Sequence, residues 1–146
     1  MRIRSVLFGI LLLLPSAAAH AGEVFVAHIW GFKTSSMATG SATFTLRDDL
    51  SAIDYVVTYE NLSSPEVMAH VHRASDPIVH YMPLGTPKEG TWLAPTAQDI
   101  AELRNEELYV NIHSEYYPTG EIRGTLVRQV VPVMPTTWGA VKALYR

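Results

Sequence analysis

Apolar and polar residues alternate along several short segments of this chain, and helical spacing is rare. In segment 52–60, apolar residues take every second position from Ile53, and polar residues fill most positions between them. Similar segments rich in Val, Ile, Thr, Tyr and Phe are separated by turn residues, which is typical of an all-β sandwich or barrel. This pattern predicts strands at Glu23–Trp30, Gly40–Leu46, Ala52–Glu60, Val67–Arg73, Ile78–Tyr81, Leu108–Ser114 and Glu121–Arg128.

One short helix is expected after the fifth strand. Thr96 suits the N-cap, Asp99 follows three residues later, and Ile100 with Leu103 forms a narrow apolar stripe. The pattern as a whole predicts an all-β, antiparallel, Greek-key-like β-sandwich, with this helix closing one end.

The first 21 residues read as a signal peptide. Arg2 and Arg4 precede an apolar run at 6–14, and small residues around Ala21 suit cleavage before Gly22. The run is shorter than the roughly 20 residues of a membrane-spanning helix. We expect an exported protein, periplasmic or extracellular, with no membrane span in its mature form.

A single domain is expected at 22–128, followed by a C-terminal tail at 129–146. Prolines at 132 and 135 exclude a long central strand in the tail. Its end is compatible with a short helix that docks Trp138, Val141 and Tyr145 on the domain or on a protein partner.

Charge and cysteine content narrow the possible functions. Without Arg2 and Arg4, nine Lys and Arg remain against 14 Asp and Glu, which argues against nucleic acid as a partner. The chain has no cysteine, which excludes thiol chemistry and metal sites with thiolate ligands.

Histidines form the clearest chemical pattern. In a strand, residues two apart project from the same face, so Ala69 and Val71 face the core while His70 and His72 share the other face, about 6 to 7 Å apart. The same alternation places His113 on an outer face. Three such imidazoles suit one metal ion. They are equally compatible with solvated surface histidines.

Two further histidines are weaker candidates for this site. His80 follows the pair on the next predicted strand and is a possible fourth ligand, and His28 is a fifth. Each is also compatible with a lone polar residue. Asn111 and Glu115 are candidates for orienting a ligand histidine, or ordinary polar residues at strand edges.

The segments Ala69-His70-Val71-His72, Leu108 to Ser114 and Pro118 to Gly124 together resemble the CHRD domain, named from chordin. The resemblance spans nearly the whole mature chain. It implies a domain of secreted proteins, one of which binds a growth factor. Arg73-Ala74-Ser75 departs from the family's usual Gly-Pro-Ala.

The histidine pattern is also distantly similar to copper-zinc superoxide dismutases. This resemblance implies that His70, His72 and His113 are copper ligands and that Arg123 attracts an anion as a catalytic residue. The disulfide, the zinc loop and the bridging histidine have no counterpart, so the resemblance implies a copper-only site. The alternative for Arg123 is a salt bridge with Glu121, two residues away, or with another exposed acidic residue.

Two hypotheses follow for function. The first is an exported metal-binding protein, with copper as the expected cofactor and zinc as the alternative, and with dismutase-like activity as its enzymatic form. The second is a non-enzymatic interaction module of the periplasm or cell surface that uses the tail as a docking element.

Overall fold

The computed structural model describes residues 22–130 and contains nine strands and one helix in this range. The signal peptide predicted at 1–21 and the tail helix predicted around Trp138 lie outside the described residues. The elements are β1 (Glu23–Gly31), β2 (Thr39–Leu46), β3 (Ala52–Glu60), β4 (Glu66–Arg73), β5 (Ile78–Tyr81), β6 (Lys88–Leu93), α1 (Ala97–Arg104), β7 (Leu108–Ser114), β8 (Ile122–Thr125) and β9 (Val127–Arg128).

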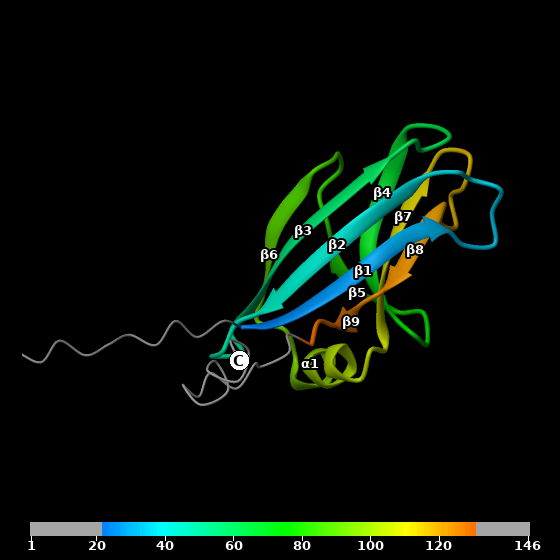
Figure 1. The fold of residues 1–146 in the computed structure, drawn as a ribbon. Helices are drawn as coiled ribbons and strands as arrows, with labels where there is room; N and C mark the ends of the chain where they lie inside the picture. Colours follow the sequence, from blue (N-terminus) through cyan, green and yellow to red (C-terminus); the bar gives the residue numbers. More distant parts are fainter. Residues whose placement is uncertain (1–21, 131–146) are drawn as a thin grey trace, which may run out of the picture.

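All strand pairs are antiparallel, and the strands form one continuous sheet in the order β5-β4-β7-β8-β1-β2-β3-β6, with β9 beside β1. The sheet curls so that β1–β3 lie in front of β4 and β7 (Figure 1). Its two edge strands approach one another where His80 of β5 stacks on Trp92 of β6, with ring centroids 5.0 Å apart. The predicted all-β fold with one short helix is confirmed, as a nearly closed barrel.

Alternation along the strands produces the core. In β3, Ile53, Tyr55 and Val57 are buried, and Tyr55 stacks on Phe44 of the neighbouring strand β2. Strands β1–β4, β7 and β8 thus contribute apolar side chains to a single interior, which removes that surface from water and supplies the main stabilising term.

An ion pair joins the edge strand β6 to β4, the strand next to the opposite edge. Lys88 of β6 is 1% exposed, and its Nζ lies 2.5 Å from Glu66 Oε1 of β4. Nζ also donates to the backbone oxygens of Pro83 and Gly85. Because buried charges are costly unless paired, this network fixes how β4 and β6 meet.

Helix α1 closes the end of the barrel at which β1 begins (Figure 1). Thr96 and Asp99 form the predicted capping box, and Ile100 and Leu103 are buried. Asp99 also accepts from Arg73, the residue after His72. The helix therefore holds the end of the strand that carries the histidine pair.

The sequence pattern missed one strand and merged two others. Strand β6 was not predicted, and the segment expected to run from Glu121 to Arg128 begins at Ile122 and divides into β8 and β9. Among the described residues, no helix is long and apolar enough to cross a membrane.

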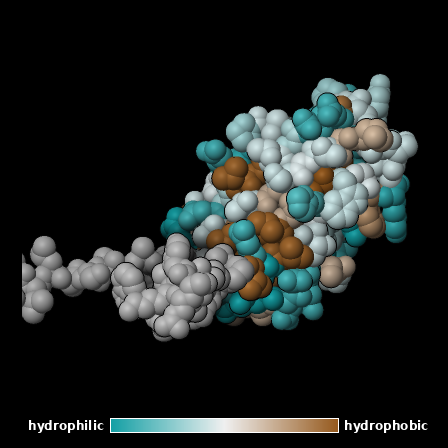
Figure 2. Space-filling view, in the orientation of Figure 1, coloured by the Kyte–Doolittle hydropathy of each residue, from teal (hydrophilic) through white to brown (hydrophobic). Residues whose placement is uncertain are grey.

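Hydrophobic side chains also reach the surface. Trp30, Tyr81, Leu93 and Tyr116 are each more than half exposed. On the face drawn in Figure 2, hydrophobic areas are separated by hydrophilic ones. Isolated exposed apolar residues of this kind are ordinary in globular proteins.

Candidate metal centre

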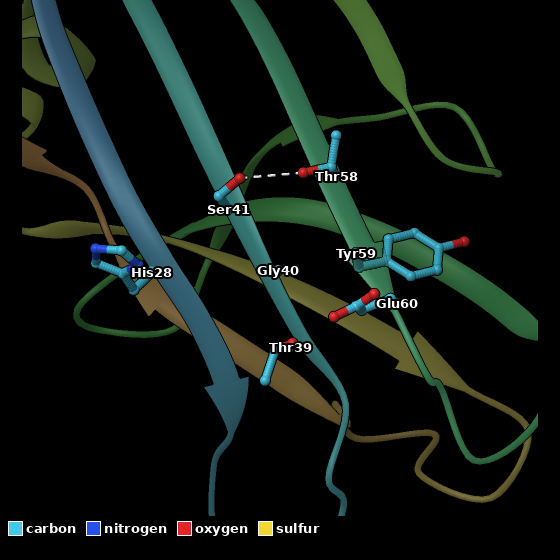
Figure 3. A pocket seen from close by; sticks show the side chains of 7 residues that line it. All are labelled: His28, Thr39, Gly40, Ser41, Thr58, Tyr59 and Glu60. Atoms are coloured by element: carbon cyan, nitrogen blue, oxygen red, sulfur yellow. Dashed lines mark hydrogen bonds between the residues drawn. The ribbon is translucent and has the colours of Figure 1, made fainter.

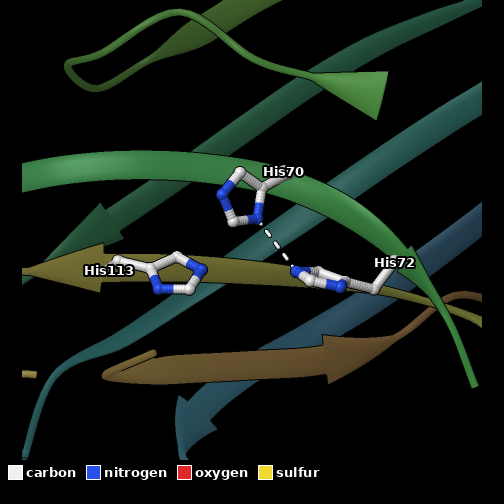
Figure 4. Close-up of side chains that lie close together, drawn as sticks. All are labelled: His70, His72 and His113. Atoms are coloured by element: carbon white, nitrogen blue, oxygen red, sulfur yellow. Dashed lines mark hydrogen bonds between the residues drawn. The ribbon is translucent and has the colours of Figure 1, made fainter. Parts of the chain in front are cut away.

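Strands β4 and β7 bring three predicted histidines together. His70 and His72 lie on β4, and His113 lies on the paired strand β7, all on the face turned away from Val71 and the core. Figure 4 shows the three rings converging, with one nitrogen of each turned toward the space between them. Although this is the outer face of the sheet, all three are at most 7% exposed.

The ring nitrogens are close enough to share one ion. One ligand nitrogen from each residue lies within 4.8 Å of the others, and His70 Nδ1 is 2.9 Å from His72 Nε2. Two ligands at about 2 Å from one metal ion can be separated by at most roughly 4 Å. A separation of 2.9 Å already fits this limit. A pair of ligand nitrogens that is wider than this limit needs only a small movement of the rings to reach it.

The His70 and His72 rings are 4.9 Å apart, closer than the 6 to 7 Å expected from strand geometry alone. Pairing between β4 and β5 shifts register between Val71 and His72. Such an irregularity bends a strand and changes the direction of its side chains. The two imidazoles meet edge to face, with an angle of 70° between their planes.

Backbone carbonyl groups fix the orientation of two rings. His72 Nδ1 lies 2.6 Å from the Asp76 backbone oxygen, and His113 Nδ1 lies 2.9 Å from the Pro118 backbone oxygen. A carbonyl oxygen only accepts, so each Nδ1 carries the proton and each Nε2 keeps its lone pair. This is the arrangement by which proteins prepare histidine ligands for a metal.

Burial favours the neutral form of His70 and His113. It lowers the pKa of His70 to about 4, with further lowering by His113 and His72. Burial also lowers the pKa of His113, against the opposing effect of its bond to Pro118. Neutral imidazoles are the form that binds metal ions, so no proton has to leave these two rings at neutral pH.

Two nitrogens in the cluster lack a partner within the described part of the chain. His70 Nε2 and His113 Nε2 are buried and accept no hydrogen bond there. Leaving buried polar atoms unsatisfied is costly. A metal ion would satisfy the His113 atom, and a donor set of imidazoles without thiolates suits copper or zinc.

His80 and His28 lie elsewhere. His80 pairs in register with Val71 and therefore points to the interior, where its ring contacts Trp92 and Tyr55. His28 is exposed on β1 and lines a hollow of about 420 Å³ on the outer face of β1–β3 (Figure 3). The structure thus does not bring either residue to the three-histidine cluster.

Arg123 lies on the same outer face, but behind an aromatic ring. Its Cζ is 4.5 Å from the Tyr109 ring centroid, and the Tyr109 ring stacks on His72 with centroids 5.0 Å apart. On its other side, Arg123 Cζ is 3.3 Å from the Phe32 ring centroid. Phe32, Arg123, Tyr109 and His72 therefore form one stacked column.

The expected salt bridge between Arg123 and Glu121 is absent from the described residues. Glu121 precedes β8, so strand alternation does not bring the two side chains together. Glu121 is instead fully buried and accepts hydrogen bonds from Ser36 and Ser63. Burial raises its pKa, but hydrogen bonds from Ser114, Ser36 and Ser63 outweigh this and lower it.

Two residues that support the cluster, Tyr109 and Asp76, were not predicted from the sequence. Tyr109 alternates with Asn111 and His113 on β7, so the same strand pattern contained its signal. Burial, followed by its hydrogen bond to Asp76, raises the pKa of Tyr109 to about 12, which keeps its hydroxyl a donor. Asp76 lies in a turn after β4, where no periodicity marked it. Neither Asn111 nor Glu115 hydrogen-bonds a cluster histidine within the described chain.

Comparison with known proteins agrees with this arrangement. Residues 22–126 match the CHRD domain, which covers β1 to β8 and all three clustered histidines. No curated protein and no solved structure gives a match. Since the match includes most of the chain and all strands of the cluster, this protein belongs to the CHRD domain family.

Proposed function

We propose that this CHRD domain protein is exported and binds one copper ion through His70, His72 and His113. The observation that carries the proposal is the convergence of three buried imidazoles whose ligand nitrogens lie within 4.8 Å of one another. Three ring nitrogens directed at one space give a donor set, and the burial of the rings limits competition from water.

Copper fits this donor set better than zinc on general affinity, since nitrogen sites bind Cu²⁺ more tightly than Zn²⁺. Imidazole nitrogens can also bind copper without a thiolate ligand, and this chain has no cysteine to supply one. Zinc remains the alternative ion. Direct competition between copper and zinc for the protein shows which of the two binds more tightly.

The test is a titration of the full-length protein with Cu(II), and separately Zn(II), against a weak competing chelator. We expect one equivalent of tightly bound copper, weaker zinc, and loss of binding when all three histidines are replaced by Gln. His28→Gln is the matched control, because His28 is exposed on β1 away from the cluster. Full copper binding by the triple variant would overturn the proposal.

Superoxide dismutase-like turnover is the enzymatic extension of this proposal, with Arg123 as the residue that attracts the anion. Two structural features argue against superoxide turnover. The Tyr109 ring lies between Arg123 and His72, and the Nε2 atoms of His70 and His113 are buried. We therefore confine the proposal to binding. Superoxide consumption by the copper-loaded protein, absent in the triple variant, would extend it to catalysis.

The interaction-module hypothesis depends on a tail that lies mostly outside the described residues. Membership of the CHRD family is compatible with it. A pull-down that compares the full chain with a chain ending at Arg128 tests it, and an identical set of partners would remove the tail from this hypothesis.

A further inference from the structure

The guanidinium of Arg123 lies against two aromatic rings and has no polar partner among the described residues. It lies between the rings of Phe32 and Tyr109, with Cζ 3.3 Å and 4.5 Å from their centroids. No hydrogen bond or ion pair joins this side chain to another residue within 22–130. Its five N–H donors are therefore available at the edge of the stacked group.

Arg123 lines a pocket of about 260 Å³ formed by the β1–β2 loop, β7 and the β7–β8 loop. A second cation, Lys33, lines the same pocket, and its Nζ is 5.2 Å from the Phe32 ring centroid. Thr34 and Thr119 add hydroxyl groups to the wall. Asp76 is the one acidic residue of the lining, and its carboxylate already accepts from the Tyr109 hydroxyl.

A buried amide in this pocket also lacks a partner. Asn111 is 6% exposed, and its Oδ1 accepts no hydrogen bond from the described residues. It pairs in register with Arg123, so both side chains stand on the same face of the sheet. Because Oδ1 accepts and does not donate, it does not bind a carboxylate oxygen, and the groups of the pocket that favour an anion are the two cations, Arg123 and Lys33.

We propose that this pocket binds a small organic carboxylate, with Arg123 as its main contact. A planar guanidinium matches the two oxygens of a carboxylate, and stacking between two rings removes most of the entropic cost of ordering it. Lys33 supplies a second charge, which favours a ligand with two carboxylates over one. The inference is independent of the metal, because Tyr109 separates Arg123 from His72.

The experiment is a calorimetric titration of the full-length, chelator-treated protein with succinate, acetate and inorganic phosphate. We expect succinate to bind more tightly than acetate or phosphate. Arg123→Gln should weaken succinate binding at least about tenfold, and Arg123→Lys should restore it only in part, because lysine lacks the fork of donors. Equal affinity for phosphate and succinate would overturn the carboxylate assignment.

Two further variants keep the test decisive if Arg123→Gln fails to fold. Lys33→Gln alters an exposed loop position and should weaken succinate binding at least about threefold, the modest effect of an exposed charge. Arg47→Gln makes the same charge change at an exposed turn and should leave binding unchanged. The triple histidine variant should keep its succinate affinity. Unchanged succinate binding in the Lys33 variant, or in a folded Arg123 variant, would overturn the proposal, whatever the result for copper.

Discussion

The phenol ring of Tyr109 lies parallel to the imidazole of His72, with centroids 5.0 Å apart and planes 4° apart. The Tyr109 hydroxyl also donates to Asp76 Oδ1, while the Asp76 backbone oxygen accepts from His72 Nδ1. Tyr109 therefore acts on His72 directly through ring contact and indirectly through the turn that contains Asp76.

Two substitutions separate these effects. Tyr109→Phe keeps the ring and removes the hydroxyl, so it should lower the free energy of unfolding by about 1 kcal/mol and leave copper affinity within about threefold. Tyr109→Ala removes a buried ring, so it should cost about 3 to 5 kcal/mol and weaken copper binding. Urea unfolding and chelator competition measure both. Equal copper affinities in the two variants would show that the ring contact does not position His72.

Gly120 should be required for the loop that orients His113. Its φ is +119°, and a Cβ added there would lie 2.4 Å from Asn111 Oδ1. Gly120→Ala therefore combines backbone strain with a clash against a buried side chain, and we expect a loss of at least about 2 kcal/mol. Because this loop contains the Pro118 carbonyl bonded to His113, copper affinity should also fall.

Gly85→Ala is the matched control for Gly120→Ala. Gly85 also has a positive φ, +96°, but no atom lies within 4 Å of an added Cβ. Gly85→Ala should lower the free energy of unfolding by about 1 kcal/mol, through backbone strain alone, and leave copper affinity unchanged. If the two variants were equally stable and bound copper equally, the contact with Asn111 would have no role in the site.

Glu121 should contribute strongly to stability although it has no cationic partner within the described residues. Its buried carboxylate accepts from Ser36 of the β1–β2 loop and from Ser63 of the β3–β4 loop. Glu121→Gln removes the charge that strengthens these bonds and turns one acceptor into a donor, so we expect a loss of about 2 to 3 kcal/mol. Urea unfolding measures it.

The control for this substitution is Glu89→Gln on the exposed surface of β6, which should change stability by less than about 0.5 kcal/mol. A similarly small effect at Glu121 would mean that the serine hydroxyls rearrange to suit an amide. The carboxylate would then not be what joins the two loops.

The sequence predicted the three-histidine cluster because strand alternation is a local property. His70 and His72 share a face whatever the rest of the fold does, and one strand pairing adds His113. The position of His80 is not local. It depends on the register between β4 and β5, which shifts beside His72 and sets His80 opposite the inward-facing Val71. The alternation of residues within one segment does not predict the register in which that strand pairs with its neighbour.

The other differences between the predicted and the observed structure also arise from contacts that are not local in sequence. Strand β6, with the sequence KEGTWL, has weak strand propensity and forms through its pairing with β3. The expected contact between Glu121 and Arg123 required both to lie in one strand, but β8 begins after Glu121, which the serines of distant loops hold instead. Contacts between loops far apart in the sequence leave no periodic signal.

Acidification should destabilise the metal-free protein through His70. Its pKa is lowered from 6.5 to about 4, first by burial and then by His113 and His72. Between these pH values the unfolded chain binds a proton on His70 that the folded chain does not, so the free energy of unfolding falls as the pH falls.

His70→Gln removes this effect. The stability of the unsubstituted protein relative to the variant should therefore decrease between about pH 7 and pH 4.5, as measured by urea unfolding with a chelator present. Copper requires a neutral His70 imidazole, and in the folded protein this ring stays neutral until the pH approaches about 4, so protonation of His70 should weaken copper affinity only below this range. A difference in stability that stays constant with pH would show that His70 titrates alike in both states.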